Sequence, residues 1–387
     1  MFRGSAWEWN DQRQQYYLHQ FVPGQPDLNY RNPDVLQAMK DVIAFWLDLG
    51  VDGFRMDAVA HIWEDESMPD EPLSGNTDDP NDYGYLNHIY TTNLPGTRKV
   101  LGEFYELIKS YEAIDGNERI SMLEVYLSPE EILPYYEVGD FPFNFQFIFN
   151  DPDVTAEDIK TKIETTLNNI PEGKHANWVL GNHDNWRIGS RTRPELMDAF
   201  NILTLTLPGV AVTYQGEEIG MINTDISYED TVDPAGCNCG PDHYDDPNCS
   251  RDPERTPMQW SASEPNAGFS DAPKTWLPVN PNYVDVNVES EAMDPSSHLN
   301  FYKTGIISRY SDPAFDVGFV KIETKANILA FSRTVDPDPN NNIYPTYVTL
   351  VNFNRENAGG FDFSGVFKED INSGVVYVSS KGTYNAG

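Results

Sequence analysis

The sequence predicts an α/β protein built from parallel βα units, followed by a small antiparallel β domain. Apolar helices and short buried strands alternate between residues 33 and 214, an order typical of parallel sheets. After about residue 312 short strands follow one another with turns between them. Asp57, Glu124 and Asp184 each stand where a predicted strand ends, and parallel strands bring such residues to one open face.

The first predicted helix covers residues 33–49, and a strand at residues 51–56 follows it at once. Asn32 can cap the start of this helix, and Gly50 suits its end. Its apolar face contains Val35, Met39, Val42, Ile43 and Trp46.

Three further predicted helices are each followed by a strand. Thr155 and Asp158 form a capping pair at the start of the second of these helices. The three pairs are residues 98–111 with 120–123, a helix after residue 155 with residues 178–180, and residues 194–206 with 210–214.

The later part of the chain predicts a long loop and a separate small sheet. Residues 225–275 are rich in proline and acidic residues, and we expect them to lie over the open face. Strands are expected at residues 328–332, 347–351 and 375–378.

The three cysteines, Cys237, Cys239 and Cys249, all fall in the long loop. One disulfide with one remaining thiol is the leading interpretation. The alternative is a zinc site that also uses His243, although Cys237 and Cys239 are closer in sequence than paired zinc ligands usually are.

The composition is that of a folded, strongly acidic chain. Asp and Glu number 61 against 26 Lys and Arg, so the formal charge is −35. Such a charge repels phosphate backbones and argues against nucleic acid as a partner. No apolar run approaches the 18 residues that a membrane span needs, so membrane anchoring is not visible in this chain.

The three acidic residues form the candidate catalytic group. A single acid at a strand end is usually a cap or a solvated residue, but two carboxylates that flank one bond suffice to break a glycosidic linkage. Arg55 points to the same side of its strand as Asp57 and, buried beside it, would keep that acid ionised. Glu124 follows an apolar strand, which would raise its pKa and suit a general acid.

Two neighbouring features fit either packing or sugar binding. His183, beside Asp184, is either a turn histidine or a hydrogen-bonding partner for sugar hydroxyls. Aromatic residues gather near the start of the chain, where they either pack together or stack on sugar rings. They are Trp7, Trp9, Tyr16, Tyr17 and Phe21.

Six ordered segments resemble the α-amylase family, glycoside hydrolase family 13. Three of them resemble signature regions of the whole family, and two others resemble its branch of α-glucosidases and oligo-1,6-glucosidases, which includes the insect maltases. The sixth resembles the segment at the eighth barrel strand. In that order the segments are residues 53–58, 124–125 and 182–184, then 25–29 and 250–260, then 209–218.

The resemblance implies a (β/α)8 TIM barrel that lacks its first strands, followed by the small antiparallel β domain. Residues 1–30 would be the end of an inserted B domain, and residues 31–312 would supply barrel strands four to eight. Residues 313–387 would be an incomplete C-terminal domain. The family's first region, which carries a histidine, has no counterpart upstream of Asp57, so we expect the chain to begin within the fold.

The resemblance also implies an activity and a set of roles. The activity is that of a retaining α-glucosidase acting on α-1,4-linked glucose in maltose, sucrose and short malto-oligosaccharides. A non-catalytic relative, such as a heavy subunit of an amino-acid transporter, is the rival interpretation, and such subunits lose the acids. The catalytic roles fall to Asp57 as nucleophile, Glu124 as acid/base and Asp184 as transition-state stabiliser, and Arg55, His183 and Arg251 match substrate-binding residues.

The same resemblance implies small α-glucosides as partners and an extracellular or membrane-surface location. No cofactor is needed for the chemistry, and no metal ligand is assigned. Some members hold a structural calcium ion, in a part of the fold that precedes these residues. Ala58 follows the matched nucleophile, and in this branch a small residue there accompanies maltose cleavage, whereas valine accompanies isomaltose cleavage.

Overall fold

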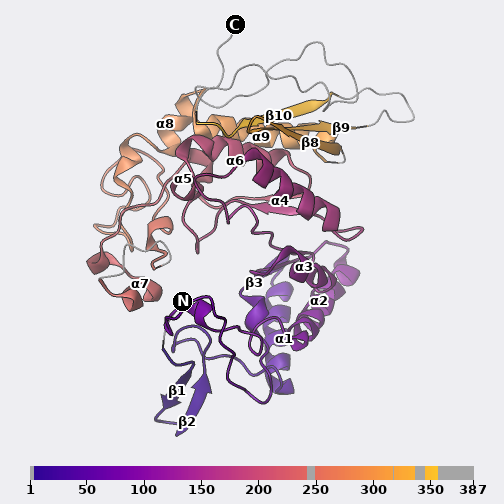
Figure 1. Ribbon diagram of the computed structural model, residues 1–387, viewed down its shortest axis with the longest axis vertical. Helices are drawn as coiled ribbons and strands as arrows, with labels where there is room; N and C mark the ends of the chain where they lie inside the picture. Colours follow the sequence, from indigo (N-terminus) through magenta and orange to yellow (C-terminus); the bar gives the residue numbers. More distant parts are fainter. Residues whose placement is uncertain (1–3, 242–248, 317, 336–344, 356–387) are drawn as a thin grey trace. The chain divides into compact units, whose positions relative to one another are not determined.

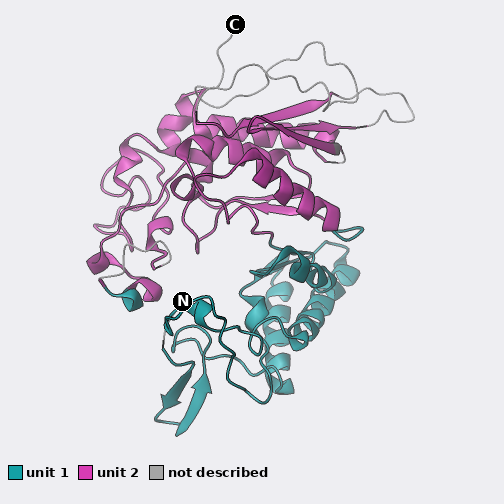
Figure 2. Ribbon diagram, in the orientation of Figure 1, with its two compact units in different colours: residues 1–143, 170–174, 237–240 teal, residues 144–169, 175–236, 241–387 magenta. Residues whose placement is uncertain are grey.

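The computed structural model describes residues 4–241, 249–316, 318–335 and 345–355. The chain divides into two compact units, coloured teal and magenta in Figure 2. Unit 1 contains residues 1–143, 170–174 and 237–240, and unit 2 contains the remaining residues. None of the helices in the described ranges is long and apolar enough to cross a membrane.

Unit 1 combines a hairpin with a parallel sheet and two long helices (Figure 1). The hairpin pairs two antiparallel strands, in which the rings of Trp9 and Tyr16 meet edge to face at 5.0 Å. The parallel sheet has the strand order β3-β4-β5. The elements are β1 Trp7–Asn10, β2 Gln15–Leu18, α1 Pro33–Asp48, β3 Gly53–Met56, α2 Pro95–Asp115, β4 Ile120–Leu123, α3 Pro129–Ile132 and β5 Phe141–Pro142.

The first helix begins where its cap was predicted, but its buried side differs from the predicted one. The side chain of Asn32 accepts a hydrogen bond from the backbone of Asp34, which satisfies one free N–H of the first turn. Ile43 and Leu47 are buried, whereas Val42 and Trp46, placed on the apolar face by the sequence, are exposed. Helical spacing shows which residues share a face, but not how much of that face is covered.

Unit 2 contains a pair of parallel strands, several helices and an antiparallel sheet. Strands β6 and β7 pair in parallel, and β8, β9 and β10 form the antiparallel sheet in the order β10-β9-β8. That sheet lies along α4 and α6 (Figure 1). The elements are α4 Ala156–Asn169, β6 Asn177–Val179, α5 Ile188–Arg191, α6 Met197–Thr206, β7 Val210–Val212, α7 Pro234–Cys239, whose last three residues are assigned to unit 1, α8 Val288–Met293, α9 His298–Ser311, β8 Phe319–Lys325, β9 Ile328–Thr334 and β10 Tyr347–Asn352.

Packed aromatic rings form part of the core of unit 2. Phe147 lies 5.3 Å from Trp178 on β6 and 6.4 Å from Phe200 on α6, measured between ring centroids. Phe353, just after β10, lies 6.1 Å from Phe200. The aromatic core therefore ties the parallel strands to the C-terminal sheet, because burying rings of this size is a large source of stability.

Most predicted elements are confirmed, and several observed elements were not predicted. The capping pair is present, since the Thr155 hydroxyl donates to Asp158 at 2.6 Å. Helix α9 and strand β8 were not predicted, and the strand expected at residues 375–378 lies outside the described residues. The expected long loop contains short helical turns, including Tyr228–Asp230 and Asp252–Glu254.

Candidate active site

Two of the three candidate acids come from neighbouring strands of unit 1. Strands β3 and β4 pair in parallel with Met56 opposite Leu123, so Asp57 and Glu124, the next residues, leave the sheet side by side. The Glu124 backbone N–H donates to the Met56 carbonyl at 2.8 Å. This bond extends the hydrogen bonding between β3 and β4 as far as the two acids. The Ala58 backbone N–H donates to Glu124 Oε2 at 3.0 Å.

Arg55 connects the two acids. Its Nη1 donates to Asp57 Oδ1, and its Nη2 lies 2.7 Å from Glu124 Oε1. The expectation that Arg55 is buried was wrong, because 31% of its side chain is exposed. The Glu124 side chain is the buried member of this group, with 4% exposed, while that of Asp57 is 72% exposed.

The environment of Glu124 raises its pKa to about 7. Burial is the largest cause, because removing water penalises the charged carboxylate. A hydrogen bond with the Asp57 carboxyl and the negative charge of Asp57 raise the pKa further, while the Ala58 N–H and the Arg55 charge lower it. The two carboxyl groups are thus within hydrogen-bonding reach, and the raised pKa of Glu124 agrees with the prediction from its apolar approach.

Asp184 lies in unit 2, in a tight turn after β6 and not directly at the strand end. The side-chain oxygen of Asn182 accepts from the Asp184 backbone at 3.0 Å and from the Asn185 amide at 3.0 Å. Arg191 donates to the carbonyls of Leu180 and Trp186, which bracket the turn. Local hydrogen bonds therefore hold this loop in one conformation.

Two arginines meet at one oxygen of Asp184. Arg251 Nη1 lies 2.9 Å from Oδ1, and Arg255 Nη2 lies 2.6 Å from the same atom. Arg255 also donates through Nε to the His183 carbonyl at 2.6 Å. The imidazole of His183 lies 3.5 Å from Oδ2 and is 46% exposed.

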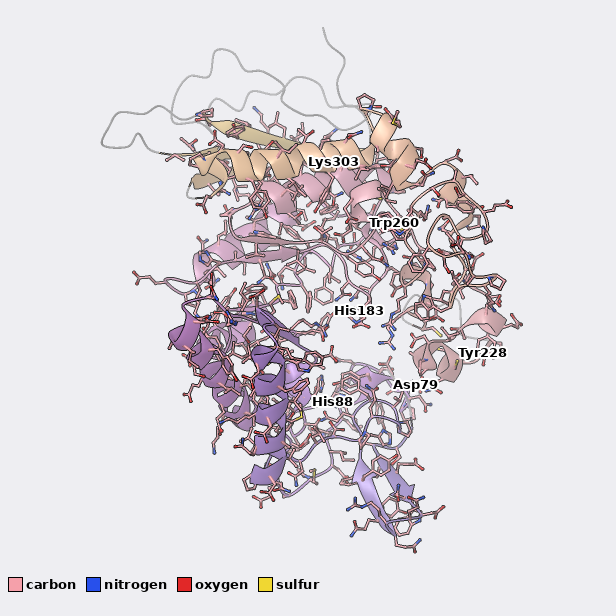
Figure 3. The ribbon with its side chains drawn as sticks, turned by 180° about the vertical axis from the view of Figure 1, so that it is seen from behind. Asp79, His88, His183, Tyr228, Trp260 and Lys303 are labelled. Carbon is pink, nitrogen blue, oxygen red and sulfur yellow. The ribbon has the colours of Figure 1, made fainter. Side chains whose placement is uncertain are left out.

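Each unit therefore contains half of the predicted site residues. Unit 1 brings together Arg55, Asp57 and Glu124, and unit 2 brings together His183, Asp184 and Arg251. Figure 3 shows His183 on the side of unit 2 away from Lys303 of α9. The sequence analysis did not predict Arg255 as a partner of Asp184. Its position four residues after Arg251, in the same segment, is the signal that could have revealed it.

The cysteines agree with the leading interpretation. Cys239 and Cys249 are disulfide-bonded, and Cys237 is exposed. His243, which the zinc alternative requires, lies outside the described residues.

Comparison with known proteins identifies the family. Residues 1–318 match the family described as alpha amylase, catalytic domain. The chain belongs to this α-amylase family. Its fold class is thus the family's (β/α)8 barrel with an antiparallel C-terminal β domain, and the described residues contribute the parallel strands β3 to β7.

Individual relatives cover most of the chain. Maltase 1 of Drosophila virilis is 46% identical over 361 residues, which are 91% of this chain and 56% of the relative. A salivary alpha-glucosidase of Anopheles gambiae is 46% identical, over 87% of this chain and 58% of the relative. The human amino acid transporter heavy chain SLC3A1 is 33% identical, over 91% of this chain and 50% of the relative. The chain spans roughly half to three fifths of these proteins' length.

Solved structures give the same family assignment. The alpha-glucosyl transfer enzyme XgtA superposes with a TM-score of 0.76 at 30% identity, covering 87% of this chain and 63% of that one.

Proposed function

We propose that the protein is a retaining α-glucosidase that releases terminal α-1,4-linked glucose from maltose, sucrose and short malto-oligosaccharides. The observation that carries the proposal is the pairing of Asp57 with Glu124, whose pKa is raised to about 7. The names of the insect relatives, maltase and alpha-glucosidase, support the substrate class.

In the proposed first step, Asp57 attacks the anomeric carbon of glucose while Glu124 gives its proton to the departing glycosidic oxygen. The glycosidic bond breaks, its electron pair goes to the leaving oxygen, and a covalent glycosyl–Asp57 ester forms. Arg55 stabilises the ionised nucleophile through its contact with Oδ1. Water, deprotonated by Glu124, then hydrolyses the ester, and glucose leaves with its original anomeric configuration.

The residues of unit 2 are proposed to hold the sugar ring and the charge that develops on it. Asp184 would stabilise the positive charge of the oxocarbenium-like transition state. His183 and Arg251 are the proposed substrate-binding residues of unit 2, and Arg55 is the proposed one of unit 1. The proposed chemistry uses carboxylates alone and requires no cofactor.

The retained acids favour catalysis over the rival interpretation. A non-catalytic member such as a transporter heavy subunit was expected to lose the three acids, yet Asp57, Glu124 and Asp184 are all present here. We further propose that the protein is secreted, by analogy with the salivary relatives.

The decisive experiment follows the anomeric configuration of the first product. The full-length protein is incubated with sucrose, which releases one glucose per cleavage, and proton NMR records the glucose anomers before mutarotation equalises them. We expect hydrolysis with α-glucose as the first product. Initial release of β-glucose would overturn the retaining mechanism, and the absence of hydrolysis of maltose, sucrose and maltotriose would overturn the proposed activity.

A further inference from the structure

We propose that Asp233 is a positioning residue, which fixes the Arg251 guanidinium so that one N–H group points at Asp184. The inference rests on the proposed function, because Asp184 matters for catalysis only if the protein hydrolyses glycosides. Asp233 lies in the long loop, outside every motif on which the family resemblance was based.

Asp233 binds Arg251 through three hydrogen bonds. Oδ2 accepts from the Arg251 backbone N–H at 2.9 Å and from Nε at 2.8 Å, while Oδ1 accepts from Nη2 at 2.6 Å. A two-point bond of this kind fixes the plane of a guanidinium as well as its position. The Nη1 group is left to reach Asp184 Oδ1 at 2.9 Å.

Asp233 is the buried partner of this ion pair, and Arg251 is partly exposed. The side chain of Asp233 is 0% exposed, whereas that of Arg251 is 20% exposed. Burial opposes ionisation of Asp233, but the Arg251 hydrogen bonds and charge outweigh it and hold the pKa of Asp233 below its usual value. The Asp233 carboxylate therefore carries a full charge against the arginine at neutral pH.

A second carboxylate holds the loop that carries Asp233. Asp252, fully buried, accepts through Oδ2 from the backbone N–H groups of Val232 and Asp233 at 2.7 and 3.0 Å. The same oxygen accepts from the Thr231 hydroxyl at 2.6 Å. Asp233 thus sits on a backbone that is braced by Asp252, the residue directly after Arg251, so both carboxylates hold the same two segments together.

Only an arginine at position 251, paired with an ionised residue 233, can make these contacts. A lysine has one nitrogen, and its point charge does not reproduce a planar fork that serves Asp233 and Asp184 together. Asparagine at position 233 would keep the shape but offer an N–H group to an arginine that has only donors. Asp233→Asn should therefore release Arg251, and with it one of the two cations at Asp184.

The test is a double-mutant cycle on maltose hydrolysis in the full-length protein. We expect Asp233→Asn to lower kcat by about a hundredfold, the loss associated with a displacement of roughly 1 Å at a reacting centre. In an Arg251→Met background the same substitution should cause less than about a twofold further loss, because Asp233 acts through Arg251. Asp233→Glu, which keeps the charge, should recover part of the activity.

Asp225→Asn serves as the matched control, since Asp225 is an exposed acid of the same loop. It should leave kcat unchanged. Full activity in Asp233→Asn would overturn the proposal. Equal losses in the wild-type and Arg251→Met backgrounds would also overturn it, because they would indicate a general structural role.

A crystal structure of Asp233→Asn supplies a readout that does not depend on activity. We expect Arg251 Nη1 to leave hydrogen-bonding distance of Asp184 Oδ1, and an unmoved guanidinium would contradict the proposed role. If the wild-type protein hydrolyses no α-glucoside, the proposed function fails, while this structure still decides whether Asp233 positions Arg251. If Asp233→Asn does not fold, Asp233→Glu allows the same comparison of the Arg251 geometry.

Discussion

The backbone N–H of Ala58 donates to Oε2 of Glu124 at 3.0 Å, and Ala58 makes this contact from a left-handed backbone conformation, with φ of 44°. The turn that follows β3 is thus bent toward the acid that follows β4. Non-glycine residues seldom adopt positive φ, and β-branched residues adopt it least readily.

Ala58→Val should therefore destabilise the protein. The added methyl groups worsen the clash that the left-handed region imposes on a side chain, and we expect the free energy of unfolding to fall by roughly 0.5–3 kcal/mol, the usual range for a destabilising substitution. Chemical denaturation of the variant measures the loss. Ala58→Gly is the comparison, because glycine adopts this φ without a clash; a valine variant as stable as the glycine variant would contradict the reasoning.

Maltose should be hydrolysed faster than isomaltose. The small side chain of Ala58 leaves room for the α-1,4 geometry next to the proposed nucleophile, and a shape difference of one or two carbons is worth about 1–3 kcal/mol. Comparing kcat/KM for the two disaccharides measures the preference. A higher kcat/KM for isomaltose would show that position 58 does not set the linkage here.

Asp57→Asn should abolish most activity. Asparagine keeps the shape of the side chain but cannot form the glycosyl ester, and removal of a nucleophile costs on the order of 10⁴-fold or more in kcat. Maltose turnover of the variant tests this expectation. Asp52→Asn, at an exposed acid just before β3, is the control and should be fully active; near-normal turnover by Asp57→Asn would remove Asp57 from the mechanism.

The activity should fall as pH rises through about 7. Glu124 must carry a proton to act as general acid, and its pKa of about 7 means that this proton is lost above neutrality. The pH dependence of kcat/KM for maltose, measured from pH 4 to 9, should show an alkaline limb near this value.

The variant Glu124→Gln tests whether Glu124 causes the alkaline limb. With an aryl glucoside, whose leaving group needs little acid assistance, the variant should retain measurable activity but lose the alkaline limb. Glu130→Gln, at an exposed acid of α3, should keep the limb of the wild-type protein. If the limb persists unchanged in Glu124→Gln, another group causes it.

Glu254 should make the protein less stable as pH rises. Burial raises its pKa from 4.5 to about 8, and neither side-chain oxygen has a hydrogen-bond partner among the described residues. Between these two values the folded chain holds a proton that the unfolded chain has lost, so the free energy of unfolding falls with rising pH. The contribution of one such group is at most about 1.4 kcal/mol per pH unit.

Denaturation of wild type and Glu254→Gln between pH 5 and 8 isolates this contribution. The variant has no ionisable group at this position, so its stability relative to wild type should increase steadily with pH. Glu289→Gln, at an exposed acid, should show no such trend. Parallel curves for Glu254→Gln and wild type would show that Glu254 does not titrate over this range.

Local patterns predicted one half of the candidate site better than the other. Asp57 and Glu124 directly follow strands whose apolar character is visible in the sequence, and their neighbourhood follows from parallel pairing of β3 with β4. The two arginines that bind Asp184 lie in a loop more than 60 residues later in the sequence. Ion pairs between such distant residues produce no periodic sequence pattern, so they could not be predicted.

Strand β8 shows why part of the C-terminal sheet was missed. Its residues include Lys321, Glu323 and Lys325, so it is not the apolar run that marks a buried strand. The turn to β9 passes through Ala326 and Asn327, both at positive φ, which suits a tight hairpin. Glycine usually marks this kind of turn in a sequence, and here alanine occupies the position, so the turn was not recognised.

The two oxygens of Asp184 are not equivalent. Oδ1 receives both guanidinium groups, while Oδ2 lies beside the imidazole of His183. Two guanidinium groups at the Oδ1 position oppose rotation of the carboxylate, because any partial turn breaks both of these bonds. The plane of the carboxylate is therefore held in one orientation, with one edge against two cations and the other edge beside the imidazole.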